Sequence, residues 1–228
     1  MRNKRAKGSV SSLDASLKHR LRRIEGGADV NEVSCSGSTA LSLAIEKGHE
    51  ESVRTLINAN ADLEMACGHS DTSLIFAVRC KQVKCVCALI EAGADVNAID
   101  FSHNSWTALM YSCLHGMEHC VRMLIDSGAD IEKYTNGGWT ALMTACSNGH
   151  DPCARALIEA GADIEAHQHQ GYTALMIARQ NGHYQCARAL IENCANLEPQ
   201  QDQGFTALMT ACEKGHDPCV RALIEANA

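Results

Sequence analysis

A short phrase returns at a fixed interval along this chain of 228 residues. An aromatic residue followed by Thr-Ala-Leu-Met begins at Trp106, Trp139, Tyr172 and Phe205, at steps of 33 residues. With the looser copies included, the anchoring threonines are Thr39, Thr72, Thr107, Thr140, Thr173 and Thr206, and only the second of their steps, at 35 residues, departs from 33. A period of this length is typical of a small structural unit that stacks on copies of itself. The chain is therefore predicted to be a repeat array.

The unit at residues 135–167 predicts two short helices joined by a tight turn. Thr140 can cap the first helix, and apolar residues then recur with helical spacing. Gly149 is placed to end that helix in the left-handed conformation, and Gly161 to end the second. Asp151 is expected to cap the second helix. On the outer face of the second helices we expect exterior ion pairs at i, i+4: Arg122/Asp126, Arg155/Glu159, Arg188/Glu192 and Arg221/Glu225.

This order of helix, Gly-His turn, helix and Gly-Ala-Asp-Ile/Val-Asn/Glu phrase resembles the ankyrin repeat. The resemblance covers residues 34–228 and implies an all-α repeat solenoid of helix-turn-helix units with β-hairpin or loop connections. The family's Thr-Pro-Leu-His is here mostly Thr-Ala-Leu-Met, so methionine is expected to supply apolar filling in place of the histidine. The predicted organisation is a disordered basic segment (1–10), an amino-terminal half-repeat (11–33), five repeats (34–66, 67–101, 102–134, 135–167, 168–200) and a truncated sixth (201–228).

The repeat at residues 67–101 is predicted to be the weakest. Lys81 stands where the other five repeats have the helix-ending glycine. A residue with a side chain costs about 1 kcal/mol in a left-handed backbone position. We therefore expect this repeat to lose stability relative to its neighbours.

Charge is divided unevenly along the chain. Residues 1–23 hold eight of the 20 Lys and Arg and one of the 27 acidic residues, so the remaining residues hold 12 basic against 26 acidic. The acidic array is expected to repel nucleic acid and to favour a partner with basic patches, with binding that weakens as salt rises. The basic head is interpreted as a solvated tail, with nuclear import or weak polyanion contact as the alternative.

The 13 cysteines fall on repeat positions, which argues against a secreted disulfide framework. Equivalent helices of stacked repeats lie about 8–10 Å apart, farther than a disulfide spans. The cysteines are thus expected to be small buried apolar side chains in a reducing compartment. The polar start of the chain and the absence of a long apolar run predict no signal peptide and no membrane span. The predicted location is the cytoplasm, with the nucleus as an alternative.

No catalytic or cofactor-binding constellation is found, and we expect no enzymatic activity. The nearest candidates for metal ligands are Cys85 with Cys87 and His167 with His169, but neither pair has a second pair to complete a site, so no metal is expected.

The aromatic residues before the threonines are the more informative feature. By resemblance to the family, this position lies at the hairpin base on the concave side, and the exposed face of the first helix also contacts partners. Large aromatic rings are frequent interface anchors, although the rings could instead keep neighbouring units in register, and the two roles can coexist. The candidate partner-binding residues are Trp106, Tyr111, Trp139, Thr144, Tyr172, Ile177 and Phe205.

Two further expectations follow from the resemblance. Leu89 with Val96-Asn97-Ala98 is similar to the pattern at which the family is hydroxylated on asparagine, which makes Asn97 a candidate modification site. As a whole, the chain is expected to be a monomeric scaffold or adaptor that binds a protein partner, through the concave face of the array. The alternative is a targeting or regulatory arm of a longer enzyme or channel, whose catalytic domain is absent from this chain.

Overall fold

The computed structural model describes residues 26–27, 29–35, 37–65, 71–100, 104–197, 212, 215 and 217–226. The chain divides into two compact units, residues 1–102 and 103–228. Both are built from pairs of short helices, so the predicted all-α repeat fold is confirmed. The predicted disordered segment, most of the half-repeat and Phe205 lie outside the described residues.

The first unit contains two helix pairs. Helices α2 (Ala40–Glu46) and α3 (Glu50–Asn58) form one repeat, and α4 (Ser73–Arg79) and α5 (Val83–Glu91) form the next. Each first helix packs on its own second helix, and helices of the same kind pack on each other, α2 on α4 and α3 on α5.

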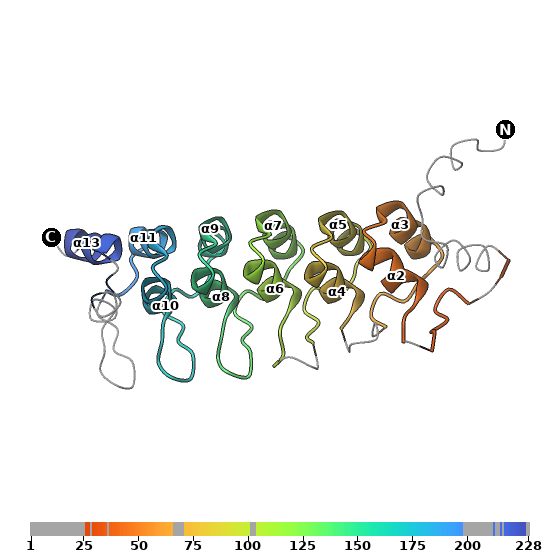
Figure 1. Ribbon diagram of the computed structural model, residues 1–228, viewed down its shortest axis with the longest axis horizontal. Helices are drawn as coiled ribbons and strands as arrows, with labels where there is room; N and C mark the ends of the chain where they lie inside the picture. The colour runs from red at the N-terminus through yellow and green to blue at the C-terminus, as the bar shows by residue number, and fades with distance from the viewer. Residues whose placement is uncertain are drawn as a thin grey trace. The chain divides into compact units, whose positions relative to one another are not determined.

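The second unit continues the same pattern with more repeats. Its first helices are α6 (Ala108–Leu114), α8 (Ala141–Ser147) and α10 (Ala174–Gln180), and its second helices are α7 (Glu118–Asp126), α9 (Asp151–Glu159), α11 (Tyr184–Glu192) and α13 (Asp217–Ala226). First helices pack on first helices, and second helices on second helices, so this unit has two rows (Figure 1). Helices of seven or nine residues are too short to be stable alone in water, so it is the packing between repeats that holds them.

Threonine capping begins most of the first helices, as predicted for Thr140. The Thr140 hydroxyl accepts a hydrogen bond from the Met143 backbone N–H at 3.3 Å, and Thr39, Thr107 and Thr173 act in the same way. Thr72 has the same extended backbone but makes no side-chain cap, and its Oγ1 is buried without a hydrogen-bond partner. A capping hydrogen bond is worth about 1 kcal/mol, so this second repeat lacks a contribution that its neighbours have.

Left-handed residues end the helices where the glycine pattern predicts. Gly149 has φ +73° and Gly161 has φ +88°. The imidazole of His183 lies so close to Gly149 that a Cβ there would meet its Nδ1 at 2.5 Å. Lys81 adopts the same conformation, with φ +57°, despite its side chain. The backbone is therefore held in the left-handed region by the fold, whichever residue occupies the position.

Small apolar side chains fill the space between the helices. Cys113, Cys120, Cys146, Cys153 and Cys186 are buried, as expected, whereas Cys212 is exposed. The methionines of the repeated phrase, Met110, Met143 and Met176, are at most 1% exposed, so they supply the apolar filling predicted for them.

Two details of the second helices differ from the prediction. Helix α9 begins at Asp151 with His150 as its N-cap, because Asp151 already takes helical geometry and its carboxylate sits in the first turn. The outer arginines do not follow the predicted i, i+4 pattern throughout. Arg155 reaches Glu192 of the next repeat at 3.3 Å, and Arg122 pairs with Glu118 and with Glu159 of the next repeat. The predicted pair Arg188/Glu192 is present at 2.7 Å.

Candidate functional site

The hairpins of the second unit fix the position of the aromatic residues. In the hairpin before α8, the Thr135 backbone N–H donates to the Trp139 carbonyl at 3.0 Å, and Tyr134 forms an isolated antiparallel bridge with Thr140. The hairpin before α10 repeats this arrangement, with the Gln168 N–H donating to the Tyr172 carbonyl at 3.1 Å. Since the hairpins are alike, Trp139 and Tyr172 occupy equivalent places at their bases.

Neighbouring hairpins are also joined to each other. The Asn136 N–H donates to the Asn104 carbonyl at 3.1 Å, and the His169 N–H donates to the Gly137 carbonyl at 3.3 Å. These main-chain bonds connect the hairpins edge to edge, and they hold the rings of successive repeats in register.

A pocket of about 470 Å³ lies between two of these repeats, and we call it the aromatic pocket. Both tryptophans of the chain, Trp106 and Trp139, belong to it and are half-buried. Its other lining residues are Asn104, Leu114, Thr135, Gly137, Thr144, Ser147 and Asn148. The pocket is thus bounded by two hairpins and by the ends of α6 and α8.

Trp106 packs within its own repeat as well as lining the pocket. Its ring centroid lies 5.0 Å from that of Tyr111, with the planes tilted by 42°. This distance is within the range of favourable aromatic pairs. The contact with Tyr111 supports a packing role for the Trp106 ring. The pocket beside the ring is compatible with a binding role, so both alternatives apply to Trp106.

The expectation that the first-helix candidates are exposed is wrong. Tyr111 is 7% exposed, Thr144 2% and Ile177 4%, and the helices that carry them pack against one another, α6 and α10 on α8. Thr144 still contributes to the pocket lining. Tyr172 is half-buried and lies at the next hairpin base, outside the pocket.

Some polar groups of the pocket make hydrogen bonds within the protein. The Thr135 hydroxyl accepts from the Trp139 N–H at 3.2 Å, and the Thr144 hydroxyl donates to the Thr140 carbonyl at 2.9 Å. The Asn148 amide nitrogen donates to the Thr144 carbonyl at 2.8 Å. These bonds stiffen the wall of the pocket before any ligand arrives.

Other polar groups remain available. Among the residues that the structure describes, no hydrogen bond reaches the indole N–H of Trp139, the side-chain amide of Asn104 or the Oδ1 of Asn148. Together these groups offer donors and an acceptor to a bound molecule. The pocket can therefore bind a ligand that presents amide-like hydrogen-bonding groups beside an apolar surface.

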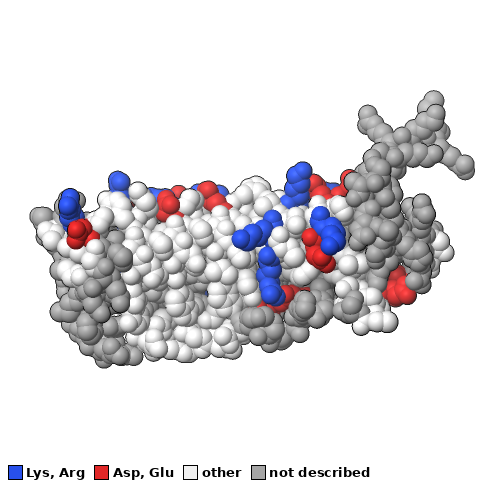
Figure 2. All heavy atoms as spheres, viewed as in Figure 1, with Lys and Arg blue, Asp and Glu red and all other residues white. Residues whose placement is uncertain are grey.

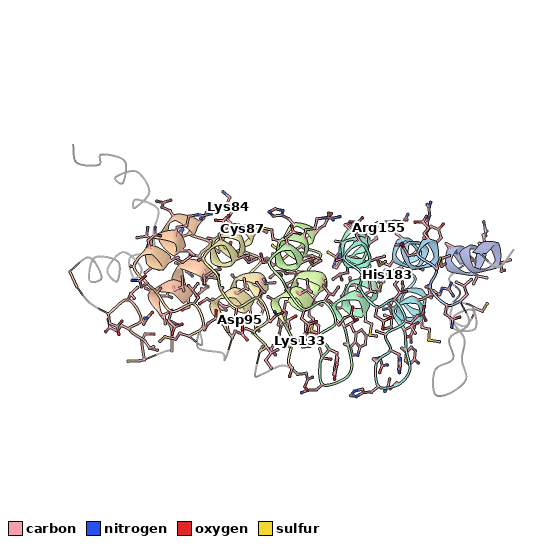
Figure 3. All side chains as sticks on the ribbon, turned by 180° about the vertical axis from the view of Figure 1, so that it is seen from behind. Lys84, Cys87, Asp95, Lys133, Arg155 and His183 are labelled. Carbon is pink, nitrogen blue, oxygen red and sulfur yellow. The ribbon has the colours of Figure 1, made fainter. Side chains whose placement is uncertain are left out.

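Charged side chains are kept away from the pocket. None of its lining residues is charged, and across 104–117, 134–149 and 167–183 the one charged residue is Arg179, which is fully buried. On the face seen in Figure 2, the charges of the second unit gather along the second helices and the area below them is nearly free of charge. Arg155, for example, lies on the second-helix row (Figure 3). The predicted attraction of basic partners by acidic surroundings thus finds no support in the pocket lining.

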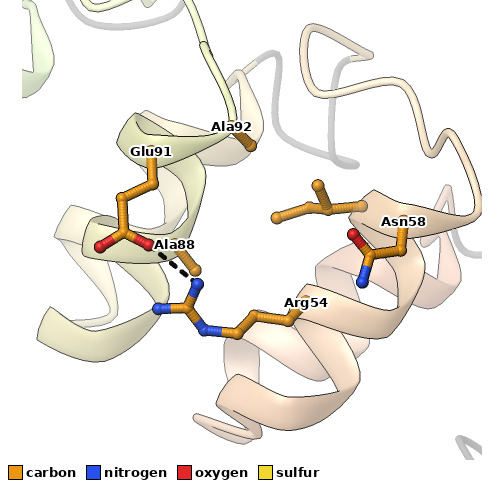
Figure 4. Close-up of a pocket in the computed structure, with 6 residues that line it drawn as sticks. Arg54, Asn58, Ala88, Glu91 and Ala92 are labelled. Carbon is orange, nitrogen blue, oxygen red and sulfur yellow. Dashed lines mark hydrogen bonds and ion pairs between the residues drawn. The ribbon is translucent and has the colours of Figure 1, made fainter.

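A smaller pocket of about 290 Å³ lies in the first unit, between α3 and α5 (Figure 4). Arg54 crosses it to reach Glu91 at 2.8 Å and also contacts Glu50 at 3.1 Å. These hydrogen bonds, with Glu91 the larger contributor, raise the pKa of the Arg54 guanidinium. Because the guanidinium is already engaged by two carboxylates, we interpret this pocket as part of the exterior ion-pair ladder.

The candidate metal ligands and the cysteine thiols do not gather at one site in the described residues. Within the described ranges no three His, Cys, Asp or Glu side chains converge on a common point. Cys85 is buried and Cys87 half-buried on α5, and none of the described cysteines is in a disulfide. Burial raises the pKa of the Cys85 thiol to about 11 and that of Cys153 to about 12, so both are protonated and unreactive near neutral pH.

The repeat position that Asn97 occupies has a structural role in other repeats. The Asn31 side-chain oxygen accepts from the Asp62 N–H at 2.8 Å, and Glu132 and Glu165 accept in the same way from the next repeat. Asn97 itself is half-buried, and its N–H donates to the Asp95 carboxylate at 2.8 Å. Its hydroxylation stays a prediction.

Arg179 is a residue that sequence reasoning missed. It occupies the position of Cys113 and Cys146 in the preceding repeats, and it is completely buried. A buried guanidinium must be solvated by protein groups, so it is costly unless well partnered. An alignment of the repeats would have revealed Arg179, because the equivalent position in the other repeats holds an apolar residue.

Paired short helices, edge-joined hairpins and a pocket between repeats define a helical repeat protein. The family model of ankyrin repeats matches three times, at residues 13–100, 99–168 and 164–228. This chain therefore belongs to the ankyrin-repeat family. Ankyrin repeats are generally protein–protein interaction modules and are typically non-catalytic.

Known relatives agree with this assignment. The ankyrin repeat protein FPV115 of fowlpox virus (strain NVSL) is 41% identical over 75 residues, which are 33% of this chain and 13% of that protein. An ankyrin repeat domain from Acinetobacter baumannii AYE is similar at a TM-score of 0.75 and 28% identity, covering 82% of this chain and 97% of that domain. The human ASB11 ankyrin repeat domain is similar at a TM-score of 0.79 and 24% identity, covering 93% and 94%, which shows the fold alone.

The chain thus matches a small part of the length of its curated viral relative. In the part of the chain that the structure describes, every helix falls short of the length and apolarity needed to cross a bilayer.

Proposed function

We propose that this chain is a protein-binding scaffold and that its partner contacts the aromatic pocket on the concave side of the array. The observation that carries the proposal is the placement of both tryptophans, Trp106 and Trp139, half-buried at the edge of one uncharged pocket. Tryptophan is among the residues that most often dominate interface energies, because a large rigid ring buries much area at little entropic cost. Tyr172, at the next hairpin base, would extend the same contact surface.

A selection from a random peptide library displayed on phage tests the proposal. Peptides would be selected on the full chain and then compared on the double variant Trp106→Ala, Trp139→Ala. We expect the selected peptides to lose binding to the double variant, since each ring is expected to act as an anchor. Peptides that bind both proteins equally would refute the pocket as the interaction site.

A matched control separates loss of contact from loss of structure. Tyr134 is an aromatic residue of the same hairpin that is 65% exposed and does not line the pocket. Tyr134→Ala should leave peptide binding unchanged. Circular dichroism of all the variants should show the same helix content.

Several further properties belong to the same proposal. The chain acts as a monomer without catalytic activity or cofactor, in the cytoplasm or the nucleus. The basic head, residues 1–23, lies outside the described residues, and it contacts polyanions weakly at most. Deletion of residues 1–23, followed by RNA pull-down and a nuclear-retention assay, tests the last statement.

The alternative function is a targeting or regulatory arm of a longer enzyme or channel. It is favoured by the small share of the fowlpox virus relative that this chain matches. Reading the coding sequence around this segment tests it: an open frame that encodes a catalytic or channel domain would support the arm, and stop codons at both borders would refute it.

A further inference from the structure

Both the aromatic rings and the hairpins recur at a fixed spacing, and this spacing restricts what can bind across them. The first helix α8 packs directly on α6 and on α10, and packed helices lie about 8–10 Å apart. The hairpins that carry the rings are also joined to one another by main-chain hydrogen bonds, so they follow the spacing of the helices beneath the array. Successive rings are therefore expected about 8–10 Å apart.

A bound segment must present an apolar group to each ring at that interval. A polyproline II helix rises about 3.1 Å per residue with three residues per turn, so residues i and i+3 share a face about 9.3 Å apart. An extended strand covers a similar distance in three residues, but its side chains alternate, so residues i and i+3 face opposite sides. Period-three contacts to Trp106, Trp139 and Tyr172 thus suit polyproline II and exclude a flat strand.

An α-helical partner also brings residues i and i+7 to one face, about 10.5 Å apart. The polar groups of the pocket distinguish the two cases. A helix satisfies its main-chain groups internally, whereas polyproline II leaves them all exposed. The free Trp139 indole N–H, Asn104 amide and Asn148 Oδ1 can pair with exposed main-chain groups, so they favour the polyproline II segment.

Charge narrows the choice further. The pocket has no charged lining residue. A charged side chain brought against it would lose hydration without gaining an opposite charge. The pocket therefore matches an uncharged segment.

We propose that the aromatic pocket, together with Tyr172 at the next hairpin base, binds an uncharged polyproline II segment with proline at every third residue. This inference rests on the proposed function. One proline packs against each ring of Trp106, Trp139 and Tyr172, and the main-chain groups between the prolines bond to Asn104 and Asn148.

Synthetic peptides test this directly, because the only two tryptophans of the chain lie in the pocket and their fluorescence reports binding. The probe is an amidated and acetylated peptide of five Pro-Gln-Ala units. The controls have the same composition with the proline spacing scrambled, or have Glu or Lys in place of Gln. A fourth control is an alanine-rich helical peptide with an apolar residue at every seventh position.

The periodic neutral peptide should bind at least about tenfold more tightly than every control, and Trp139→Ala should weaken it at least about tenfold. Tyr134→Ala should leave its affinity unchanged. Equal affinity for scrambled spacing, tighter binding of a charged or helical peptide, or no binding up to millimolar concentration would overturn the proposal.

The phage selection separates this proposal from the broader one. If the selected peptides need both tryptophans but lack the three-residue period, the polyproline inference fails and the protein-binding function stands. If no selected peptide needs the tryptophans, both fail.

Discussion

Replacing Lys81 by glycine should stabilise the first unit. Lys81 has φ +57°, a conformation that costs an L-residue about 1–2 kcal/mol. Glycine removes that cost but loses about 0.5–1 kcal/mol through greater chain entropy on folding. The exposed lysine side chain makes no ion pair with any described residue, so little else is lost. The expected net gain is about 0.75 kcal/mol from the midpoints of the two ranges, or about 1.5–3 °C in the unfolding midpoint for a chain of this size.

Thermal and urea unfolding followed by circular dichroism measures the effect, and Lys47→Gly is the matched control. Lys47 is also an exposed lysine at the end of a first helix, but its φ is −86°. Glycine should therefore destabilise the protein at this position, by about 0.5–1 kcal/mol. The reasoning would be refuted if Lys81→Gly lowered the midpoint, or if the two variants shifted it in the same direction.

The other predictions concern caps, turns, thiols and salt. Thr140→Val should cost about 1 kcal/mol of unfolding free energy through the lost cap, whereas Thr72→Val should be neutral or stabilising because its hydroxyl is buried without a partner; equal losses in urea titrations would contradict this. Gly149→Ala should destabilise by more than about 1 kcal/mol in the same titrations, because its Cβ meets the adjacent imidazole and its φ is positive. Iodoacetamide at pH 8 should label the exposed Cys194 within minutes and spare Cys153 in the folded protein, since burial raises the Cys153 pKa to about 12 and keeps it protonated; rapid labelling of Cys153 by mass spectrometry would argue against this. The affinity of a peptide for the aromatic pocket should change less than about twofold between 50 and 500 mM salt, because no charged residue lines the pocket, and a steep loss in fluorescence titrations would count against the neutral site.

Features that depend on a few neighbouring residues were predictable from the sequence. The Thr140 cap and the left-handed Gly149 each require only residues within one turn, so the repeated phrase specifies them. The lysine at position 81 could be recognised as out of place for the same reason. A local error, Asp151 as cap in place of His150, is a shift of a single residue at a helix start, where boundaries vary by one or two residues.

Partners that lie in another repeat were harder to predict. Arg155 pairs with Glu192 across 37 residues, although Glu159 is nearer in sequence, because equivalent second helices lie side by side. Tyr111 and Ile177 are likewise buried on helices that pack against α8 of the repeat between them. Neither fact can be read from a single repeat. Helical periodicity indicates which residues lie on one face of a helix, but it does not indicate what packs against that face.

The candidate site was likewise predictable only in part. Its aromatic residues could be named in advance, since Trp106 and Trp139 stand at one position of the repeated phrase. That they border a single pocket, and that no charged residue lines it, became evident only from the packed structure.

The sequence by itself determined the period, the helix pair in each repeat, the caps and the family, because these follow from contacts within some 30 residues that recur at every copy. Tertiary structure decided which side chains are exposed, which charges meet and where the pocket opens. The physical reason is that a repeat cannot bury its own apolar face, so the surface left for binding is set by how neighbouring repeats pack.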